Sequence, residues 1–337
     1  MRSEITLTGI TTTGTPHIGN YVGAIRPAIE ASRDPDVQSF YFLADYHALV
    51  KCHDPMVLRQ ATLEVAATWL ALGLDTATSI FYRQTDIPEI LELTWILTCM
   101  TAKGLMNRAH AYKAAVQENE AIKAQDPDKG INMGLFSYPI LMAADILMFK
   151  AQKVPVGKDQ IQHLEMARDI AMRFNHLYGE TFILPTAVTD ERAAVLRGLD
   201  GRKMSKSYNN TIPLFMPEKK LRKLIMKITT NSQGPDEPKD PENCTLFQIF
   251  QAVAQPDDVQ ALRHRYAQGI AWGEMKQYLF EYLNQLLKEP RKRYEDLLRN
   301  PTHIEQTLRE GARKARAYSI PFLQQIRKAV GVATLGT

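Results

Sequence analysis

Short apolar runs alternate with longer amphipathic stretches over the first hundred residues. Three runs of strand length are rich in β-branched and aromatic residues: 5–10, 39–44 and 79–84. Three longer stretches carry apolar residues at helical spacing: 20–32, 55–73 and 88–100. Strand and helix therefore alternate three times, which predicts parallel strands joined by helices that cover both faces of the sheet.

The pattern changes in the rest of the chain. A helical insertion is predicted over about 104–135, where apolar periodicity is lost and the chain could face a substrate. Helical spacing resumes at 137–151 and 159–175, and 181–185 reads as a further strand. A loop rich in proline and charge at 232–243 leads into helical patterns without strand candidates.

This order of elements predicts an α/β protein with a Rossmann-like, doubly wound parallel sheet and a helical carboxyl-terminal domain. We expect the sheet domain at 1–210 and the helical domain at 211–337. A chain of 337 residues is longer than one core usually supports, which agrees with two domains. In doubly wound sheets, ligands bind at the carboxyl ends of the strands, so functional side chains are expected there.

Composition and charge narrow the class of protein only slightly. A net charge of +4 is compatible with a polyanionic partner but does not predict one. The most apolar run, 138–149, is short and contains Asp145, and the amino terminus lacks a signal pattern, so we expect a cytoplasmic protein without a membrane span. Cys52, Cys99 and Cys244 lie far apart, so they are expected to be buried and to form no disulfide or metal site.

A turn rich in glycine and threonine follows the first strand, in the sequence TGITTTGTPHIGNYVG. Gly9 and Gly14 permit tight turns, and Gly19 and Asn20 stand where the next helix begins, whose free N–H groups suit a phosphate. The turn matches neither the P-loop nor the GxGxxG spacing, and a plain connection between strand and helix is the alternative. His17 favours the functional interpretation, because an imidazole beside a phosphate can donate to developing negative charge.

A second candidate anion site lies in GRKMSKSYNN, residues 201–210. Lys203 and Lys206, with Ser205 and Ser207, can form a loop that presents ammonium groups to a polyphosphate. A solvated run of surface charge is the alternative for this stretch alone. Together with the glycine-rich turn, the loop predicts a nucleoside triphosphate held from two sides.

Asp145 lies among apolar residues, so its carboxylate is expected to be buried and to need a hydrogen-bond donor. An arginine or a backbone N–H could supply the donor. Alternatively, Asp145 accepts a hydrogen bond from one N–H or O–H of a ligand in an apolar pocket lined by Met142 and Tyr138. In PVGKDQIQH, residues 155–163, Gly157 and Asp159 predict a turn from strand to helix, where Asp159 caps the helix or binds a ribose or an amino group.

These motifs resemble a known family. HIGN at 17–20 and KMSKS at 203–207 resemble the HIGH and KMSKS signatures of class I aminoacyl-tRNA synthetases. YPILMAADIL, PVGKDQIQH and the chain length resemble the bacterial tryptophanyl-tRNA synthetases within this class, from about residue 4 to the carboxyl terminus. The resemblance implies that ATP, with Mg²⁺, converts L-tryptophan to tryptophanyl adenylate, that the tryptophanyl group passes to tRNA(Trp), and that the chain is a homodimer without a DNA partner.

The resemblance also implies roles for matching positions. Catalysis would fall to His17, Asn20, Lys203 and Lys206. ATP would be bound by Thr11, Thr12, Thr13, Gly19, Asn20, Gly157, Lys158, Asp159, Val195, Lys203, Met204, Ser205, Lys206 and Ser207. Tryptophan would be bound by Asp145, as acceptor of the indole N–H, and by Met142, Tyr138, His47, Val154, Val156 and Gln160. No metal ligands are implied, and the helical domain, which has eleven Lys and Arg against five Asp and Glu from 288 to 328, would read the anticodon.

The chain departs from the family pattern at several positions, and other functions stay open. Thr11, Thr12 and Thr13 stand where the family has Gln-Pro-Ser, and the other departures are Ala111, Lys158 and Tyr208. The alternatives are a tyrosyl-tRNA synthetase, a nucleotidyltransferase of the HIGH superfamily that acts on a small molecule, and an RNA-binding relative without catalysis. The Asp145 segment favours tryptophan over tyrosine, and the helical extension and complete KMSKS disfavour the nucleotidyltransferase.

Overall fold

The structure is a computed structural model that describes residues 4–157, 160–189 and 196–333. Its strands are β1 (Glu4–Thr11), β2 (Val37–Ala44), β3 (Ile80–Arg83), β4 (Lys153–Pro155) and β5 (Thr186–Val188). The helices of the first half are α1 (Ile18–Asn20), η1 (Tyr21–Ile25), α2 (Arg26–Ala31), α3 (Asp45–Ala48), α4 (Pro55–Ala71), η2 (Gln84–Asp86), α5 (Pro88–Met100), α6 (Lys103–Met106), α7 (His110–Ala121), α8 (Met133–Met148) and α9 (Ile161–Tyr178). Those that follow are η4 (Lys206–Tyr208), α10 (Glu218–Ile225), α11 (Thr245–Val253), α12 (Pro256–Gln268), α13 (Trp272–Arg299) and α14 (Pro301–Ala329).

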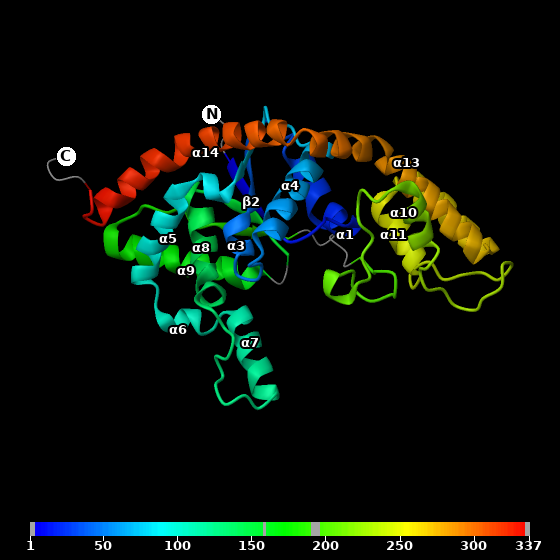
Figure 1. Ribbon diagram of the computed structural model, residues 1–337, viewed down its shortest axis with the longest axis horizontal. Coiled ribbons are helices and arrows are strands. Elements are labelled where there is room, and N and C mark those ends of the chain that lie inside the picture. Colours follow the sequence, from blue (N-terminus) through cyan, green and yellow to red (C-terminus); the bar gives the residue numbers. More distant parts are fainter. Residues whose placement is uncertain (1–3, 158–159, 190–195, 334–337) are drawn as a thin grey trace.

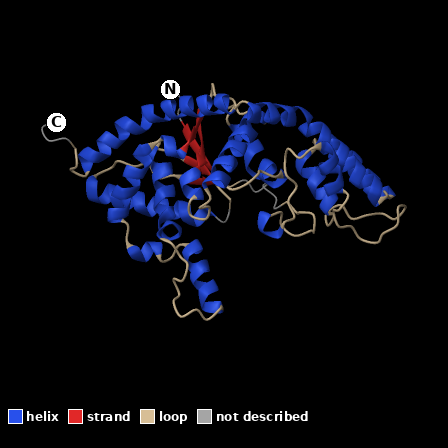
Figure 2. Ribbon diagram, viewed as in Figure 1, coloured by secondary structure: helices blue, strands red, loops and turns tan. Residues whose placement is uncertain are grey.

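The described strands form one parallel sheet in the order β3-β2-β1-β4-β5, surrounded by helices (Figure 2). β1 lies at the centre and pairs with β2 along its whole length, from Glu4 opposite Val37 to Thr11 opposite Ala44. The order of the strands reverses between β1 and β4. In doubly wound sheets this reversal opens a crevice at the carboxyl ends of the two strands, where ligands bind.

Most elements predicted from the apolar pattern are confirmed, but the strand expected at 181–185 is wrong. The strand instead begins directly after this run, at Thr186–Val188. The Asn175 side chain accepts hydrogen bonds from the backbone of Thr181 and Phe182 and donates to the Phe182 carbonyl. Arg168 donates to the Pro185 carbonyl. Side chains of α9 thus satisfy backbone groups that a strand would have paired with a neighbour.

Apolar side chains gather into three clusters. One fills the sheet face covered by α5, α8 and α9, and another fills the opposite face around Trp69 of α4. The third lies among α10 to α13 and includes Ile18 and Met204. Met204 therefore anchors the charged loop at 201–210 beside α1, the helix that follows the glycine-rich turn. The domain boundary at 210 stays a prediction.

The long helix α14 continues the arc of α13 across the molecule and packs along the edge strand β3 (Figure 1). Gly311 allows this approach, because a Cβ at this position would lie 1.7 Å from the carbonyl oxygen of Phe81. Arg83 at the end of β3 is ion-paired with Glu305, and Arg316 with the buried Glu89 of α5. The edge of the sheet is therefore covered by a helix, which protects it from pairing with another chain.

The segment from 104 to 135 contains α7, which projects from the body of the molecule (Figure 1). None of the α7 residues is buried. Cys244 is buried as predicted, but Cys52 is half-buried and Cys99 is exposed. Cys99 lies off the stripe of Ile90, Leu93 and Leu97 that α5 turns toward the core. Within the described ranges, no helix has both the length and the apolar character needed to cross a membrane.

Candidate active site

A cavity of about 600 Å³ opens at the point where the strand order reverses. Its walls come from the carboxyl-terminal halves of β1 and β2, from β4, and from α3 and α8. Asp145 lines one part of it, and Thr11, Thr13 and Gly157 line another. One continuous space therefore connects the buried carboxylate with the glycine-rich turn.

Asp145 is buried, as predicted, but its hydrogen-bond partners are neither an arginine nor a backbone N–H. His47 Nε2 lies 2.8 Å from its Oδ2. The Gln84 amide nitrogen lies 2.8 Å from Oδ1 and 3.0 Å from Oδ2. Burial raises the pKa of Asp145, and the hydrogen bonds from His47 and Gln84 oppose this effect because they favour the charged form.

The residues expected to surround a tryptophan side chain lie together. The cavity is lined by all seven of them: His47, Tyr138, Met142, Asp145, Val154, Val156 and Gln160. Four other apolar residues complete the wall near Asp145: Leu7, Phe42, Ala44 and Ile146. The cavity thus combines apolar walls with one buried carboxylate, an arrangement that suits an apolar group carrying one hydrogen-bond donor.

His163 joins two of these residues and was not predicted from the sequence. Its Nε2 lies 2.6 Å from the Tyr138 hydroxyl, and its Nδ1 lies 3.0 Å from Gln160 Oε1. His163 is buried at the start of α9. It therefore ties a side chain of α8 to the turn that begins α9, and only the spacing of Gln160 and His163 in one helical turn signals this in the sequence.

The glycine-rich turn brings a buried imidazole to the start of the next helix. The backbone N–H of His17 donates to Asn20 Oδ1 over 3.0 Å, which holds the entry to the helix. Burial, and then the nearby Lys206 charge, lower the pKa of His17 to about 4, so the ring is neutral at pH 7. Within the described residues His17 Nδ1 has no hydrogen-bond partner, and neither has the buried Thr12 hydroxyl. Both groups therefore keep hydrogen-bonding capacity that the described part of the chain does not use.

The loop at 201–210 meets this turn through Lys206. The ammonium group of Lys206 donates to the carbonyl oxygen of Thr13, and burial lowers its pKa. The Lys206 nitrogen also lies beside Gly14, since a Cβ added to Gly14 would be 3.2 Å from it. Gly14 has a φ of +66°. The two motifs, almost two hundred residues apart in the sequence, are therefore in contact at the cavity.

Asn210 organises the loop and was not predicted from the sequence. Its side chain accepts from the Ser205 N–H over 2.8 Å and donates to the Lys203 carbonyl over 3.0 Å. The Ser205 hydroxyl accepts from the Ser207 N–H over 3.3 Å. Gly198 lies against Asn210, because an added Cβ there would be 2.4 Å from the amide carbon of Asn210. The Asn210 side chain and the Ser205 hydroxyl thus fold the loop back on itself.

Some predicted residues lie elsewhere or beyond the description. Lys158, Asp159 and Val195 are outside the described residues. Lys203 is exposed. In the described structure the cavity lining does not include several of the residues predicted for ATP binding or catalysis: Thr12, His17, Gly19, Asn20, Lys203, Met204, Ser205, Lys206 and Ser207. Tyr208, where the family has an aspartate, lies under the guanidinium of Arg202, which is 4.4 Å from the centre of its ring.

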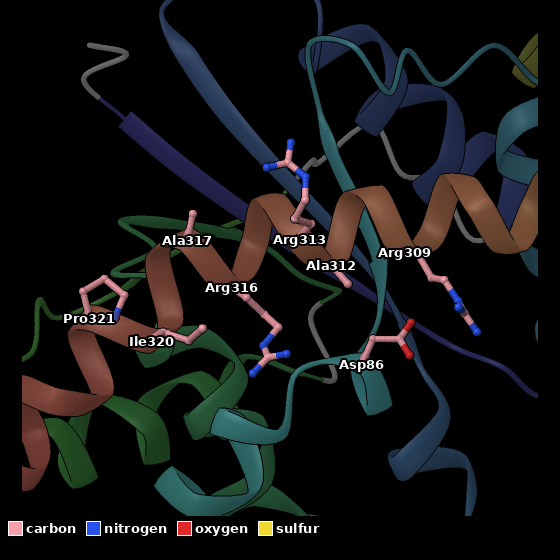
Figure 3. Close-up of a pocket in the computed structure, with 8 residues that line it drawn as sticks. All are labelled: Asp86, Arg309, Ala312, Arg313, Arg316, Ala317, Ile320 and Pro321. Atoms are coloured by element: carbon pink, nitrogen blue, oxygen red, sulfur yellow. The ribbon is translucent and has the colours of Figure 1, made fainter.

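A second hollow, of about 610 Å³, lies along α14 and is separate from this site (Figure 3). It is lined by Asp86, Ile320, Pro321 and three arginines, Arg309, Arg313 and Arg316. Each arginine is paired with a glutamate of the chain: Glu305, Glu310 and Glu89 respectively. The positive charge of this hollow is therefore largely neutralised, and the cavity at the sheet remains the candidate active site.

Comparisons with known proteins show the family to which the chain belongs. The chain matches the model of the tRNA synthetases class I (W and Y) over residues 2–288. It is 60% identical over 332 residues to the tryptophan–tRNA ligase of Pseudomonas aeruginosa, covering 98% of this chain and 74% of that one. It is 57% identical over 335 residues to that of Neisseria meningitidis, covering 99% and 100%. The fold is similar to that of a tryptophanyl-tRNA synthetase from Campylobacter jejuni complexed with ADP and tryptophan, with a TM-score of 0.88, 44% identity, and 97% and 99% of the two chains covered.

Proposed function

Since the chain belongs to the class I tRNA synthetases for tryptophan and tyrosine, we propose that it activates L-tryptophan with ATP and transfers the tryptophanyl group to tRNA(Trp). The observation that carries this proposal is the single cavity that runs from Asp145 to the Thr11 and Thr13 turn. An apolar pocket with one acceptor and a phosphate-binding turn are thereby placed in one space. Tryptophan and ATP can meet there.

In the first step, a carboxylate oxygen of tryptophan attacks the α-phosphorus of ATP. The bond to the bridging oxygen breaks, tryptophanyl adenylate forms, and pyrophosphate leaves. We assign the pyrophosphate end to Lys206 and to the turn that leads into α1, which contains Thr12 and His17 and accepts a hydrogen bond from Lys206 at the Thr13 carbonyl. Because negative charge develops on the phosphate oxygens, donors already in place there lower the barrier.

Tryptophan itself is held by the other end of the cavity. The indole N–H donates to Asp145, and Met142, Val154 and Val156 pack against the ring. A ligand without this donor would leave the buried carboxylate with an unfilled acceptor site, which disfavours its binding. Tyr138 and Gln160, tied through His163, lie where they can meet the amino acid head group.

The second step and the partners follow from the same activity. The terminal ribose hydroxyl of tRNA(Trp) attacks the carbonyl carbon of the adenylate, and AMP leaves. Among the described residues, no group of three His, Cys, Asp or Glu side chains is placed to hold a metal, so Mg²⁺ would enter on the phosphate oxygens of ATP. We further propose a cytoplasmic homodimer whose helical region at 211–337 reads the anticodon.

Tyrosine is the strongest rival substrate, because the family model covers enzymes for both amino acids. The two curated relatives compared above are tryptophan–tRNA ligases over nearly the whole of this chain, and this favours tryptophan. The intact helical region and the contact between the two signature motifs likewise favour a synthetase over a small-molecule nucleotidyltransferase.

Aminoacylation tests the complete proposal. Purified protein is incubated with ATP, Mg²⁺, a tRNA(Trp) transcript and radiolabelled tryptophan, and the label in acid-precipitable RNA is counted. We expect charging of tRNA(Trp), with tRNA(Tyr) and labelled tyrosine as the matched control that stays uncharged. Charging of tRNA(Tyr) with tyrosine, or of neither RNA, would refute the proposal.

A further inference from the structure

Gln84 is the buried residue that holds the carboxylate of Asp145, although the two lie 61 positions apart in the chain. It begins η2, directly after the edge strand β3, and it is fully buried. Its amide nitrogen lies 2.8 and 3.0 Å from the two carboxylate oxygens. Because one nitrogen reaches both oxygens, Gln84 fixes the plane of the carboxylate as well as its position.

The orientation of the Gln84 amide is itself fixed. The backbone N–H of Tyr46 donates to Gln84 Oε1 over 3.1 Å. Since a backbone N–H can only donate, the oxygen of the amide must face Tyr46 and the nitrogen must face Asp145. Tyr46 belongs to α3, the helix that also carries His47, so the same short helix orients both partners of the carboxylate.

The acceptor sites of Asp145 can then be counted. A carboxylate has about four acceptor positions, two on each oxygen. Gln84 takes one on each oxygen, and His47 takes the second on Oδ2. Counting the partners that the described residues supply, one position is left, on Oδ1, and the carboxylate lines the cavity that would hold the indole ring.

We propose that Gln84 is a specificity-determining positioning residue, which leaves Asp145 Oδ1 with a single acceptor site aimed at a planar ligand's N–H donor. The proposal rests on the proposed function and deepens it. Among the described residues, the hydrogen bonds of the Gln84 side chain go to Asp145 and Tyr46, and Gln84 does not line the cavity, so its effect acts through Asp145. Without Gln84 the carboxylate can rotate toward His47 or take up a proton, and in either case the N–H of tryptophan loses its fixed partner.

The test compares tryptophan with an analogue that lacks the donor. Benzothienylalanine has sulfur in place of the indole N–H and nearly the same shape. ATP–pyrophosphate exchange is measured with both amino acids for the intact chain, for Gln84→Met and for Gln84→Glu. Gln84→Glu preserves the shape and places a second carboxyl group against Asp145, so a result is available even if Gln84→Met does not fold.

We expect both variants to raise the KM for tryptophan by about 10- to 100-fold, because a hydrogen bond to a charged group is lost or misdirected. The KM for benzothienylalanine should stay within about threefold, and so should kcat with saturating tryptophan. Gln152→Met is the matched control, since the Gln152 amide accepts from the backbone N–H of Ile5 and no described hydrogen bond joins it to Asp145. It should leave the preference between the two amino acids unchanged.

The outcomes separate this inference from the proposed function. If the intact chain shows no exchange with tryptophan, the proposed function fails. If the intact chain is active and both Gln84 variants keep its preference for tryptophan over benzothienylalanine, the positioning role is refuted. An equal loss for both amino acids would indicate a purely structural role and would also overturn it.

Discussion

At the level of single residues, the site contains ionisable groups whose pKa values are shifted by burial. Burial raises the pKa of Asp145 and lowers those of His17 and Lys206. Beside the glycine-rich turn, the neutral imidazole of His17 and the ammonium group of Lys206 lie near each other without strong repulsion. At the other end, Gln84 donates to Asp145 without adding charge. Each end of the cavity therefore presents the type of group that its proposed ligand needs.

His17 makes the stability of the fold depend on pH. Its pKa is lowered from 6.5 to about 4, so between these values the unfolded chain binds a proton that the folded chain does not. This contribution to stability is complete above pH 6.5 and is lost as the pH falls toward 4. After allowance for solvent screening it is on the order of 2 kcal/mol.

Urea unfolding at pH 7.5 and pH 4.5 tests this contribution. The intact chain should lose about 2 kcal/mol more of its unfolding free energy between these pH values than His17→Gln does. His176→Gln, which removes an exposed histidine, should behave like the intact chain. Equal losses for the intact chain and His17→Gln would contradict the assignment.

The Lys206 side chain should affect the rate of adenylate formation and not the binding of tryptophan. Lys206→Met removes the donor that reaches the Thr13 carbonyl and, we propose, the leaving pyrophosphate. We expect kcat for adenylate formation to fall by about 10²- to 10³-fold, while the KM for tryptophan changes by less than about threefold. Single-turnover adenylate formation measures the rate, and the exposed Lys220→Met serves as the control. A parallel change of kcat and KM would argue against a role in the transition state.

Several partners within the site could not be predicted from the sequence. Asp145 was expected to be buried from its apolar neighbours, and it is. Its donors come from η2 and α3, and nothing local in the sequence signals an approach between Gln84 and Asp145. The same holds for Asn210, whose bonds within the loop depend on how the backbone folds. Tertiary contacts decide such pairings, whereas burial follows from local composition.

At the level of elements, apolar spacing predicts long helices and buried strands well. The helix expected at 88–100 is α5, and the strand expected at 39–44 is the core of β2. Short strands are harder to predict, because three residues carry too little of the apolar pattern. A strand was expected at 181–185, directly before the actual β5. The packing of α14 on β3 was not predicted either, since it depends on Gly311 and not on any periodicity.

Gly311 should therefore be essential for the placement of α14. In Gly311→Ala the new Cβ would lie 1.7 Å from the Phe81 carbonyl oxygen, so α14 must shift away from β3. We expect a loss of about 3 kcal/mol, of the size seen for overpacking. Gly273→Ala is the matched control, because a Cβ there meets nothing within 4 Å and alanine favours a helix.

Thermal unfolding followed by circular dichroism measures both variants. Gly311→Ala should unfold several degrees below the intact chain, and Gly273→Ala at the same temperature or slightly above it. If Gly311→Ala unfolds at the temperature of the intact chain, α14 does not lie this close to the sheet.

At the level of the whole molecule, the alternation of strands and helices was sufficient to predict a parallel sheet and a helical carboxyl-terminal region. The pattern did not predict that the last helix returns to the sheet. α14 contributes to the clusters on both sheet faces, through Ile304 and Leu308 on one and through Phe322 and Ile326 on the other. The region that we propose to read the anticodon thus includes α14, which packs on β3. Gln84 directly follows β3 in the chain.

We propose that this molecule brings tryptophan and ATP together in one cavity. ATP–pyrophosphate exchange with each of the twenty amino acids tests it most directly, because exchange requires both substrates and needs no tRNA. We predict exchange that is stimulated by tryptophan, exceeds that with tyrosine by at least about a thousandfold in kcat/KM, and is absent with the others. Exchange stimulated by tyrosine and not by tryptophan, or by none of the twenty, would contradict the account.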